Sequence, residues 1–392
     1  IHSGGWKILR YALPFLSLLS LGLYLADILG SSLFYLLLTF FFLLSLYTSK
    51  LVQPAYLQLN KIAGEMDTLS ESLLHIEKEA FRSESLQQLQ SGLKSKETGS
   101  SIIIKNFKKI IDRLDYRLNP LVFFPLNTFL FWDIQQIFSL ESWKEDHKQD
   151  IGRWFETLAS FEALSSFGTL AYNHPGWSYP SLTNNDGVFE TEELGHPLIP
   201  ASKRVCSSFS TSGLAQLGLI TGSNMAGKSP FLRSVGVNMV LAMAGAPVCA
   251  KRLSGANMKI MSSMRISDNL EESTSTFYAE LKKLKQIIEA VNNKEKVFLL
   301  LDEILRGTNS GDRHTGSAAL IKQLIQQEAC GLIATHDLEL AKLADQYPAH
   351  IHNYHFDVQV SGEELYFDYK LKRGVCKSMN ASLLMKKIGI EL

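Results

Sequence analysis

The eight residues from Gly222 to Ser229 have the types and spacing of a loop that binds phosphate groups. They match the pattern Gly-x4-Gly-Lys-Ser/Thr. Gly222 and Gly227 allow the backbone to approach a phosphate closely, Lys228 supplies a positive charge for binding and catalysis, and the Ser229 hydroxyl is a ligand for Mg²⁺. The remaining loop residues, whose backbone N–H groups would surround the phosphates, are Ser223, Asn224, Met225 and Ala226. The loop predicts ATP and Mg²⁺ as cofactors.

The segments on either side of this loop favour the same interpretation. The apolar run Leu214–Ile220 predicts a buried strand, and Phe231–Ala244 predicts a helix. The glycines therefore fall at a strand-to-helix turn, where the helix N-terminus attracts anions.

A second apolar strand, Lys296–Asp302, ends in two consecutive acids. We expect Asp302 to lie on the Mg²⁺ side. Glu303 would orient or deprotonate the attacking water, because phosphoryl transfer depends mainly on positioning and charge stabilisation.

A third buried strand, Gly331–Thr335, is followed directly by His336. Ligands of open α/β sheets bind beyond the carboxyl ends of the strands, so His336 is expected to contact the γ-phosphate and to take part in catalysis. Hydroxyl residues Ser275 and Thr276 precede a predicted helix, Tyr278–Val291. They are helix caps or, alternatively, phosphate contacts made across a subunit interface.

Together these motifs resemble the C-terminal ATPase domain of the MutS family, the DNA mismatch-repair ATPases within the ABC-type class. The motifs that carry the resemblance are Asn224-Met225 with Lys228-Ser229, Ser275-Thr276-Phe277, Asp302-Glu303-Ile304-Leu305-Arg306-Gly307-Thr308, and Ala334-Thr335-His336. The resemblance covers about Gly195 to Leu392.

The resemblance implies an α/β fold, a Mg²⁺-dependent ATPase activity and a homodimer with composite ATP sites. In such dimers each nucleotide lies between the loop of one subunit and the signature of the other, so Ser275 and Thr276 would act in trans. Coupling of ATP to DNA binding or to a process like mismatch repair is also implied.

One residue departs from the family pattern next to the magnesium ligand. Pro230 stands where the family has threonine, and proline has no N–H to donate to phosphate. Proline also disfavours helical geometry in the residue before it, here Ser229. We therefore expect nucleotide binding and activity to be weakened but retained.

The N-terminal fifty residues predict a two-helix transmembrane hairpin. Tyr11–Ala26 and Ile28–Ser49 carry no charged residue, and the second stretch is long enough to span a bilayer. Lys7 and Arg10 precede the pair and Lys50 and Lys61 follow it, so both ends should be cytoplasmic. The expected protein is multi-pass, with its ATPase domain in the cytoplasm; a soluble helical hairpin is the alternative.

The domain boundaries that follow are 1–50 for the hairpin, 51–180 for a mainly helical connector and 181–392 for the ATPase domain. Leu and Ile spacing predicts connector helices over Gln53–Leu93, Phe107–Leu118 and Trp143–Phe167. Glu97–Ser101 is expected to be a break, and Tyr172–Glu193 a loop-like junction.

Charge composition gives no independent support for DNA binding. Lys and Arg together number 39, as do Asp and Glu, so the net charge is zero. A dedicated DNA-binding domain usually has a basic stripe. Two other functions remain open: an ABC-type transport ATPase, and a nucleotide-sensing membrane scaffold with little turnover.

Overall fold

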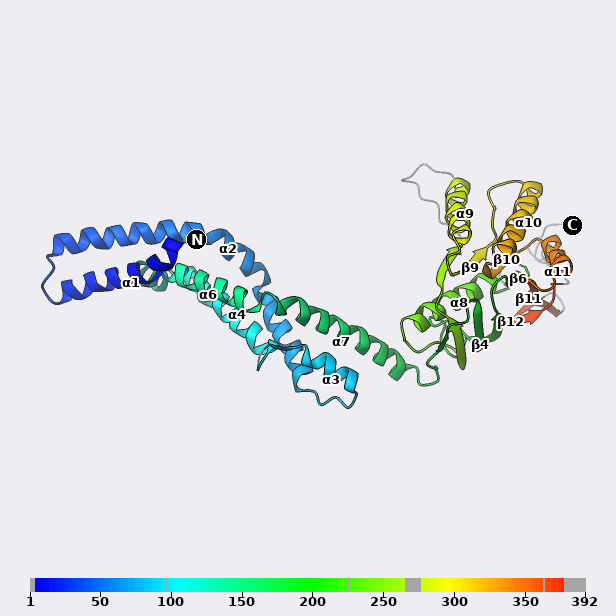
Figure 1. Cartoon of the computed structure of the whole chain (residues 1–392), viewed down its shortest axis with the longest axis horizontal. Coiled ribbons are helices and arrows are strands. Elements are labelled where there is room, and N and C mark those ends of the chain that lie inside the picture. The colour runs from blue at the N-terminus through cyan, green and yellow to red at the C-terminus, as the bar shows by residue number, and fades with distance from the viewer. Residues whose placement is uncertain (1–3, 96, 224–225, 265–275, 362–363, 377–392) are drawn as a thin grey trace. The chain divides into compact units, whose positions relative to one another are not determined.

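The computed structural model describes residues 4–95, 97–223, 226–264, 276–361 and 364–376. The chain forms two compact units, Ile1–Ser165 and Ser166–Leu392. The first is helical and the second is mixed α/β (Figure 1).

The first unit is a set of packed helices with one short β-hairpin. Its elements are α1 Gly4–Leu25, α2 Ser31–Lys78, α3 Glu84–Ser91, β1 Lys94–Ser95, β2 Thr98–Gly99, α4 Ser100–Leu114, the 3-10 helix η1 Asp115–Leu118, α5 Pro120–Leu130, α6 Trp132–His147 and the larger part of α7 Asp150–Asn173. One buried cluster joins Leu13 of α1 and Phe41 of α2 to Phe131 and Ile134. The predicted hairpin and the helices that follow it therefore share a core.

Several predicted bounds in this unit are wrong. The helix predicted over Gln53–Leu93 ends at Lys78, and the predicted break at Glu97–Ser101 contains β2 and the start of α4. The helix predicted over Trp143–Phe167 is interrupted between His147 and Asp150. Helix α5 was not predicted, because two prolines and a run of aromatic residues hide its helical period.

The second unit is built around a six-stranded sheet in the order β12-β11-β6-β10-β9-β8. All neighbours are parallel except β11 and β12, and a four-stranded sheet, β3-β7-β4-β5, packs beside it. The strands are β3 Ser181–Thr183, β4 Val188–Leu194, β5 Ser207–Ser212, β6 Leu217–Thr221, β7 Arg252–Ala256, β8 Lys259–Ser263, β9 Val297–Asp302, β10 Cys330–Thr335, β11 Ile351–Ser361 and β12 Glu364–Arg373. The helices are α8 Lys228–Met243, α9 Thr276–Asn292, α10 Ser310–Gln326, η2 Leu338–Lys342 and α11 Leu343–Gln346.

Two buried clusters cover opposite faces of the large sheet. One joins α8 and the small sheet to one face, through residues such as Phe231, Phe209 and Phe298. The other joins α9 and α10 to the opposite face, through Ile287, Leu324 and Leu299. The three strands predicted around the chemistry form β6, β9 and β10, and all their residues are buried. The predicted junction Tyr172–Glu193 contains β3 and most of β4, so it is not simply a loop.

Candidate nucleotide-binding and hydrolysis site

The carboxyl ends of β6, β9 and β10 bring the predicted chemical groups to one edge of the sheet. The register pairs Thr335 with Thr221 and Ala334 with Asp302, so the loop after β6, the acids after β9 and His336 after β10 begin at the same level. This is the edge at which parallel α/β sheets bind ligands.

The phosphate loop turns on its two glycines. Gly222 has φ +149° and Gly227 has φ +110°, and a Cβ on Gly222 would lie 2.9 Å from the Phe356 carbonyl oxygen. Both positions need glycine for conformation, and Gly222 also needs it for space. Gly227 caps α8, and Ala226 within the loop is buried. Asn224 and Met225 lie outside the described residues.

Lys228 is almost fully buried under this loop. Its Nζ donates to the carbonyl oxygens of Gly222 (2.8 Å) and Ser223 (3.0 Å) and lies 3.3 Å from His336 Nε2. Burial lowers the pKa of Lys228 to about 8, although the charges of Glu303 and Asp302 raise it. In this arrangement the ammonium group is held by loop carbonyls that a phosphate would replace.

The buried ammonium predicts a pH dependence of ATP affinity between pH 7 and 9. Phosphate stabilises the charged form, so binding is full below the free-state pKa of about 8 and weakens as pH rises through it. ATP should bind about ten-fold more weakly at pH 9 than at pH 7, measured by nucleotide titration at constant ionic strength. Lys228→Arg should remove the slope, because a guanidinium stays charged throughout. An unchanged slope in that variant would contradict the assignment to Lys228.

Asp302 carries a buried carboxylate with a free oxygen. Its Oδ1 has no hydrogen-bond partner in the described part of the chain. Asp302 ends β9, and half-buried Ser229 lies in the first turn of α8. An unpaired buried oxygen is costly unless a cation or donor meets it, so these residues fit a Mg²⁺ ion.

Glu303 is held by charged groups on both sides. Its Oε1 lies 2.5 Å from His336 Nε2, and its Oε2 contacts Arg306. Burial alone would raise the pKa of Glu303, but the hydrogen bond from His336 and the charges of His336, Arg306 and Lys228 outweigh it and lower the pKa. Glu303 is therefore ionised, and each of its two carboxylate oxygens contacts a partner, His336 or Arg306.

The backbone is strained at Glu303 and, two residues later, at Leu305. Their φ angles are +50° and +60°, a region that non-glycine residues rarely adopt. The Glu303 N–H donates to Ala334 O at 2.9 Å, and the Leu305 N–H donates to Glu280 Oε1 at 2.5 Å. Phe277 packs on Gly307, where an added Cβ would lie 2.5 Å from the Phe277 Cβ. The start of α9 thus supports the loop that carries Glu303.

The support role of Glu280 was missed at the sequence level, because a glutamate on an amphipathic helix has no distinguishing signal. Glu280→Ala should lower turnover about ten-fold with little change in ATP affinity, because it frees the strained Leu305 backbone without touching the phosphate loop. Glu280→Gln keeps an acceptor oxygen and should remain near wild-type activity. Steady-state kinetics with nucleotide titration distinguish the two, and equal loss in both variants would contradict a positioning role.

The remaining predicted site residues are only partly described. Ser275 lies outside the described residues. Thr276 begins α9, and its side chain lies outside the described part of the structure. The arrangement of the signature around a nucleotide stays a prediction.

The prediction that Pro230 holds Ser229 out of helical geometry is wrong. Helix α8 begins at Lys228 and includes both residues, and the Phe231 N–H already bonds to Gly227 O at 3.0 Å. Buried Phe231, Leu232 and Val235 pack the helix against the sheet. The stabilisation from this packing exceeds the preference of Ser229, as the residue before a proline, for extended geometry. The missing N–H of Pro230 remains.

Pro230→Thr should therefore strengthen nucleotide binding only through the restored donor. One charge-assisted hydrogen bond is worth roughly 1.5–3 kcal/mol, which corresponds to about ten-fold tighter ATP binding or more. Isothermal titration of both forms measures this difference. Pro230→Ala also restores the N–H and should match the threonine variant; equal binding in all three forms would mean that the loop does not use this donor.

The fold and this edge have the arrangement of a P-loop domain: strand, glycine loop and helix, with a neighbouring parallel strand that ends in acids. Residues 218–387 match the family model of MutS domain V. The C-terminal part of this chain therefore belongs to the MutS domain V family.

Several longer proteins are similar to part of this chain. The chain is 34% identical over 224 residues to the DNA mismatch repair protein MutS of Chlorobium phaeovibrioides, covering 55% of this chain and 25% of that protein. It is 30% identical over 250 residues to the DNA mismatch repair protein MutS of Thermotoga petrophila, covering 62% and 30%. Human MutS protein homolog 4 is 31% identical over 254 residues, covering 62% and 26%. The chain thus spans between 25% and 30% of the length of these relatives.

Proposed function

We propose that the second unit binds Mg²⁺-ATP and hydrolyses it. The observation that carries this proposal is the meeting of Lys228, Asp302, Glu303 and His336 at one edge of the sheet. Lys228 binds the β- and γ-phosphates, Ser229 and Asp302 hold the metal, and His336 contacts the γ-phosphate. When bound, Mg²⁺ neutralises charge that develops on the phosphates.

Glu303 orients the attacking water once its partners rearrange. Both of its oxygens are engaged, one by His336 and one by Arg306. Either partner must move before a water can replace it. The same pair favours a second candidate function, a nucleotide-sensing scaffold with little turnover. The transport alternative has no comparable support, because the matched family is MutS.

A steady-state ATPase assay of the purified protein, with and without duplex DNA, tests these functions together. Hydrolysis that duplex DNA stimulates or inhibits supports an ATPase coupled to DNA, as the names of the relatives suggest. ATP binding without turnover supports the sensor. Absence of ATP binding overturns both.

The proposed active form is a homodimer in which Ser275 and Thr276 complete the site of the partner subunit. Mixing a Lys228→Ala subunit with a Ser275→Ala subunit leaves one intact composite site in each mixed dimer. Such dimers should regain up to half of the wild-type activity per dimer. No recovery, in a preparation shown to exchange subunits, would argue for action in cis.

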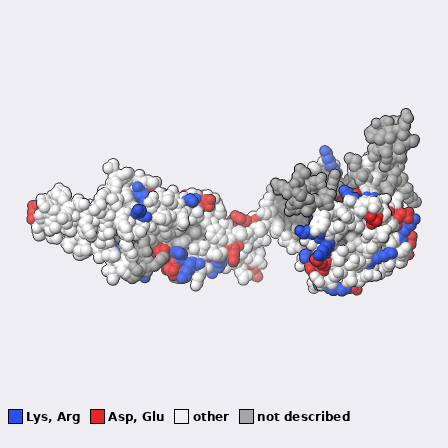
Figure 2. All heavy atoms as spheres, turned by 90° about the horizontal axis from the view of Figure 1, so that it is seen from above, with Lys and Arg blue, Asp and Glu red and all other residues white. Residues whose placement is uncertain are grey.

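The helical unit is proposed to anchor the protein in a membrane. Two described helices, α1 and α2, are long and apolar enough to cross a bilayer by length and composition. Asp27, at the tip, is the one charged residue between Arg10 and Lys50, and Figure 2 shows this end of the molecule almost free of blue and red. Arg10 and Asp27 are separated by roughly 25 Å of helix at 1.5 Å per residue, close to the thickness of a hydrocarbon core.

Tyrosines stand near both ends of this apolar stretch. Tyr11 and Tyr47 are exposed near the charged end, and the rings of Tyr24 and Tyr35 meet near the tip, 6.3 Å apart. Aromatic residues gather at membrane–water interfaces in this way. Extraction of membranes with alkaline carbonate tests the anchor: release of the protein into the soluble fraction would contradict it.

A further inference from the structure

Helix α5 lies against the apolar hairpin although it is far from it in sequence. Asn127 Nδ2 donates to Ser45 O at 3.1 Å, and Ser17 Oγ donates to Phe129 O at 2.6 Å. The rings of Phe42 and Phe124 are 5.6 Å apart. These contacts fall inside the uncharged stretches of α1 and α2, beyond their charged ends.

The outer face of α5 is apolar and exposed. No charged residue occurs between Arg117 and Asp133, and α5 lies in this stretch. Leu121 is 86% exposed, Val122 and Phe124 are exposed as well, and exposed Leu118 lies just before the helix in η1. A cluster of this kind is unfavourable in water and indicates a surface that something apolar covers.

Polar groups mark a boundary on one side of α5. Arg117 pairs with Asp133 at 3.3 Å and donates to Ser49 Oγ at 2.8 Å. Arg10 Nε donates to Gln135 Oε1 at 3.1 Å. From Ser49 to Leu38, α2 rises by roughly 16 Å at 1.5 Å per residue, about half of a hydrocarbon core. The contacts of α5 with α2 occur within this length.

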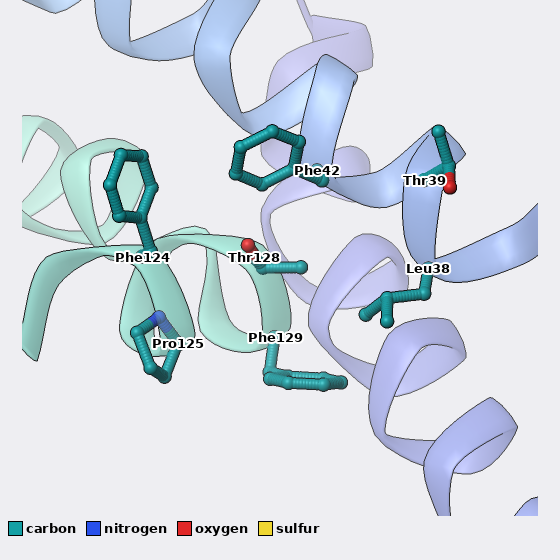
Figure 3. A pocket seen from close by; sticks show the side chains of 7 residues that line it. All are labelled: Leu38, Thr39, Phe42, Phe124, Pro125, Thr128 and Phe129. Carbon is teal, nitrogen blue, oxygen red and sulfur yellow. The ribbon is translucent and has the colours of Figure 1, made fainter. Parts of the chain in front are cut away.

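A groove of about 370 Å³ runs between α2 and α5. Figure 3 shows the seven side chains that line it: Leu38, Thr39, Phe42, Phe124, Pro125, Thr128 and Phe129. The Thr39 hydroxyl donates to Tyr35 O at 2.8 Å, so it is satisfied within its own helix. The remaining lining is mostly hydrocarbon and aromatic ring, and it continues the exposed apolar surface of the hairpin.

We propose that α5 is a third membrane-embedded element, seated in the leaflet at the charged end of the hairpin, and that the groove holds an acyl chain of a bilayer lipid. The proposal rests on the proposed membrane anchor. It follows from the position of α5: a bilayer that contains the hairpin from Arg10 and Ser49 to Asp27 also contains the contacts at Ser45, Phe42 and Leu38. The lipid that surrounds the hairpin then reaches the open groove and covers Leu121.

Cysteine labelling of the full chain in phosphatidylcholine vesicles tests this depth. The background variant is Cys206→Ser, because Cys206 is the exposed native cysteine and the other three are buried. Single cysteines replace Leu121 on α5, Phe15 on α1 and Leu57 on α2 beyond Lys50; all three positions are exposed. A membrane-impermeant maleimide labels only thiols that water reaches.

The cysteine at 57 should be labelled rapidly, and those at 15 and 121 at least ten-fold more slowly. Slow labelling at 15 with rapid labelling at 121 would overturn the third element while the anchor stands. Rapid labelling at all three positions would overturn the anchor and this proposal with it.

Fluorescence quenching tests the occupant of the groove. A bimane label on Leu38→Cys should be quenched by lipids that carry a nitroxide on the acyl chain. Thr39→Trp, which fills the groove from an exposed position, should reduce this quenching by more than half, whereas Thr39→Ser should not. Equal quenching in both variants would overturn acyl-chain binding in the groove.

Discussion

Glu303→Gln should cut ATP turnover by about 10²-fold or more while ATP affinity stays within about two-fold of the wild type. The amide keeps the size of the side chain but cannot accept a proton or attract water as a carboxylate does. Asp302, Ser229 and Lys228 are unchanged, so phosphate and metal binding remain. Single-turnover hydrolysis and nucleotide titration on the same preparation measure the two effects separately.

Glu295→Gln provides the matched control for this variant. Like Glu303, Glu295 is a carboxylate paired with a cationic side chain, here Lys259 at 2.8 Å, but it lies on the surface of the same unit and outside the site. Its turnover should equal that of the wild type. If Glu303→Gln retained full hydrolysis, another group would be activating the water and the assigned role would be wrong.

The Glu303→Gln variant also tests whether the contacts of Glu303 with Arg306 and His336 oppose nucleotide binding. Glutamine cannot pair with Arg306 and His336 as the carboxylate does, so the variant also releases the side chains that engage Glu303. A variant that binds ATP more tightly than the wild type would indicate that this pairing opposes the nucleotide-bound arrangement.

The sequence predicted the parts of the site that depend on local patterns. Glycines at fixed spacing specify the loop. Apolar runs and the terminal acids specify β6, β9 and β10, because each of these strands is fully buried and is a nearly continuous apolar stretch. The contacts of Arg306 with Glu303 and of Glu280 with the Leu305 backbone could not be predicted. These contacts depend on a positive φ at Glu303 and at Leu305. Glutamate and leucine rarely adopt positive φ, so the sequence gives no sign of this backbone conformation.

The helical unit was harder to predict for a different reason. Helix α2 continues from the apolar stretch through Pro54 to Lys78. The change from apolar to mixed composition therefore falls inside one helix and does not mark where the helix ends. In α5, Asn119 caps the start and Phe131 with φ +49° ends it, which are weak signals among aromatic residues. Tertiary contacts, such as Asn127 with Ser45, fix these elements.

Lys228→Met should weaken ATP binding by about 10²-fold or more and, at the same time, stabilise the nucleotide-free protein. Two charge-assisted contacts to phosphate, each worth roughly 1.5–3 kcal/mol, are lost with the ammonium group. Burial lowers the pKa of Lys228 from 10.5 to about 8, so the protonated form is disfavoured in the folded state. At pH 7 this penalty is fully present, and the methionine side chain keeps most of the volume, so the free energy of unfolding should rise by about 1–3 kcal/mol.

The pH dependence of this gain distinguishes burial of charge from improved packing. Between pH 8 and 10.5 the wild-type folded state releases the proton while the unfolded state still binds it, so wild-type stability rises relative to the variant and the gain disappears. Urea unfolding of both proteins at pH 7 and pH 10.5 measures the difference in their free energies of unfolding. The exposed control Lys342→Met should change neither ATP affinity nor this slope. A stability gain that persists at pH 10.5 would mean that methionine simply packs better, and unchanged ATP affinity would mean that this loop is not the phosphate site.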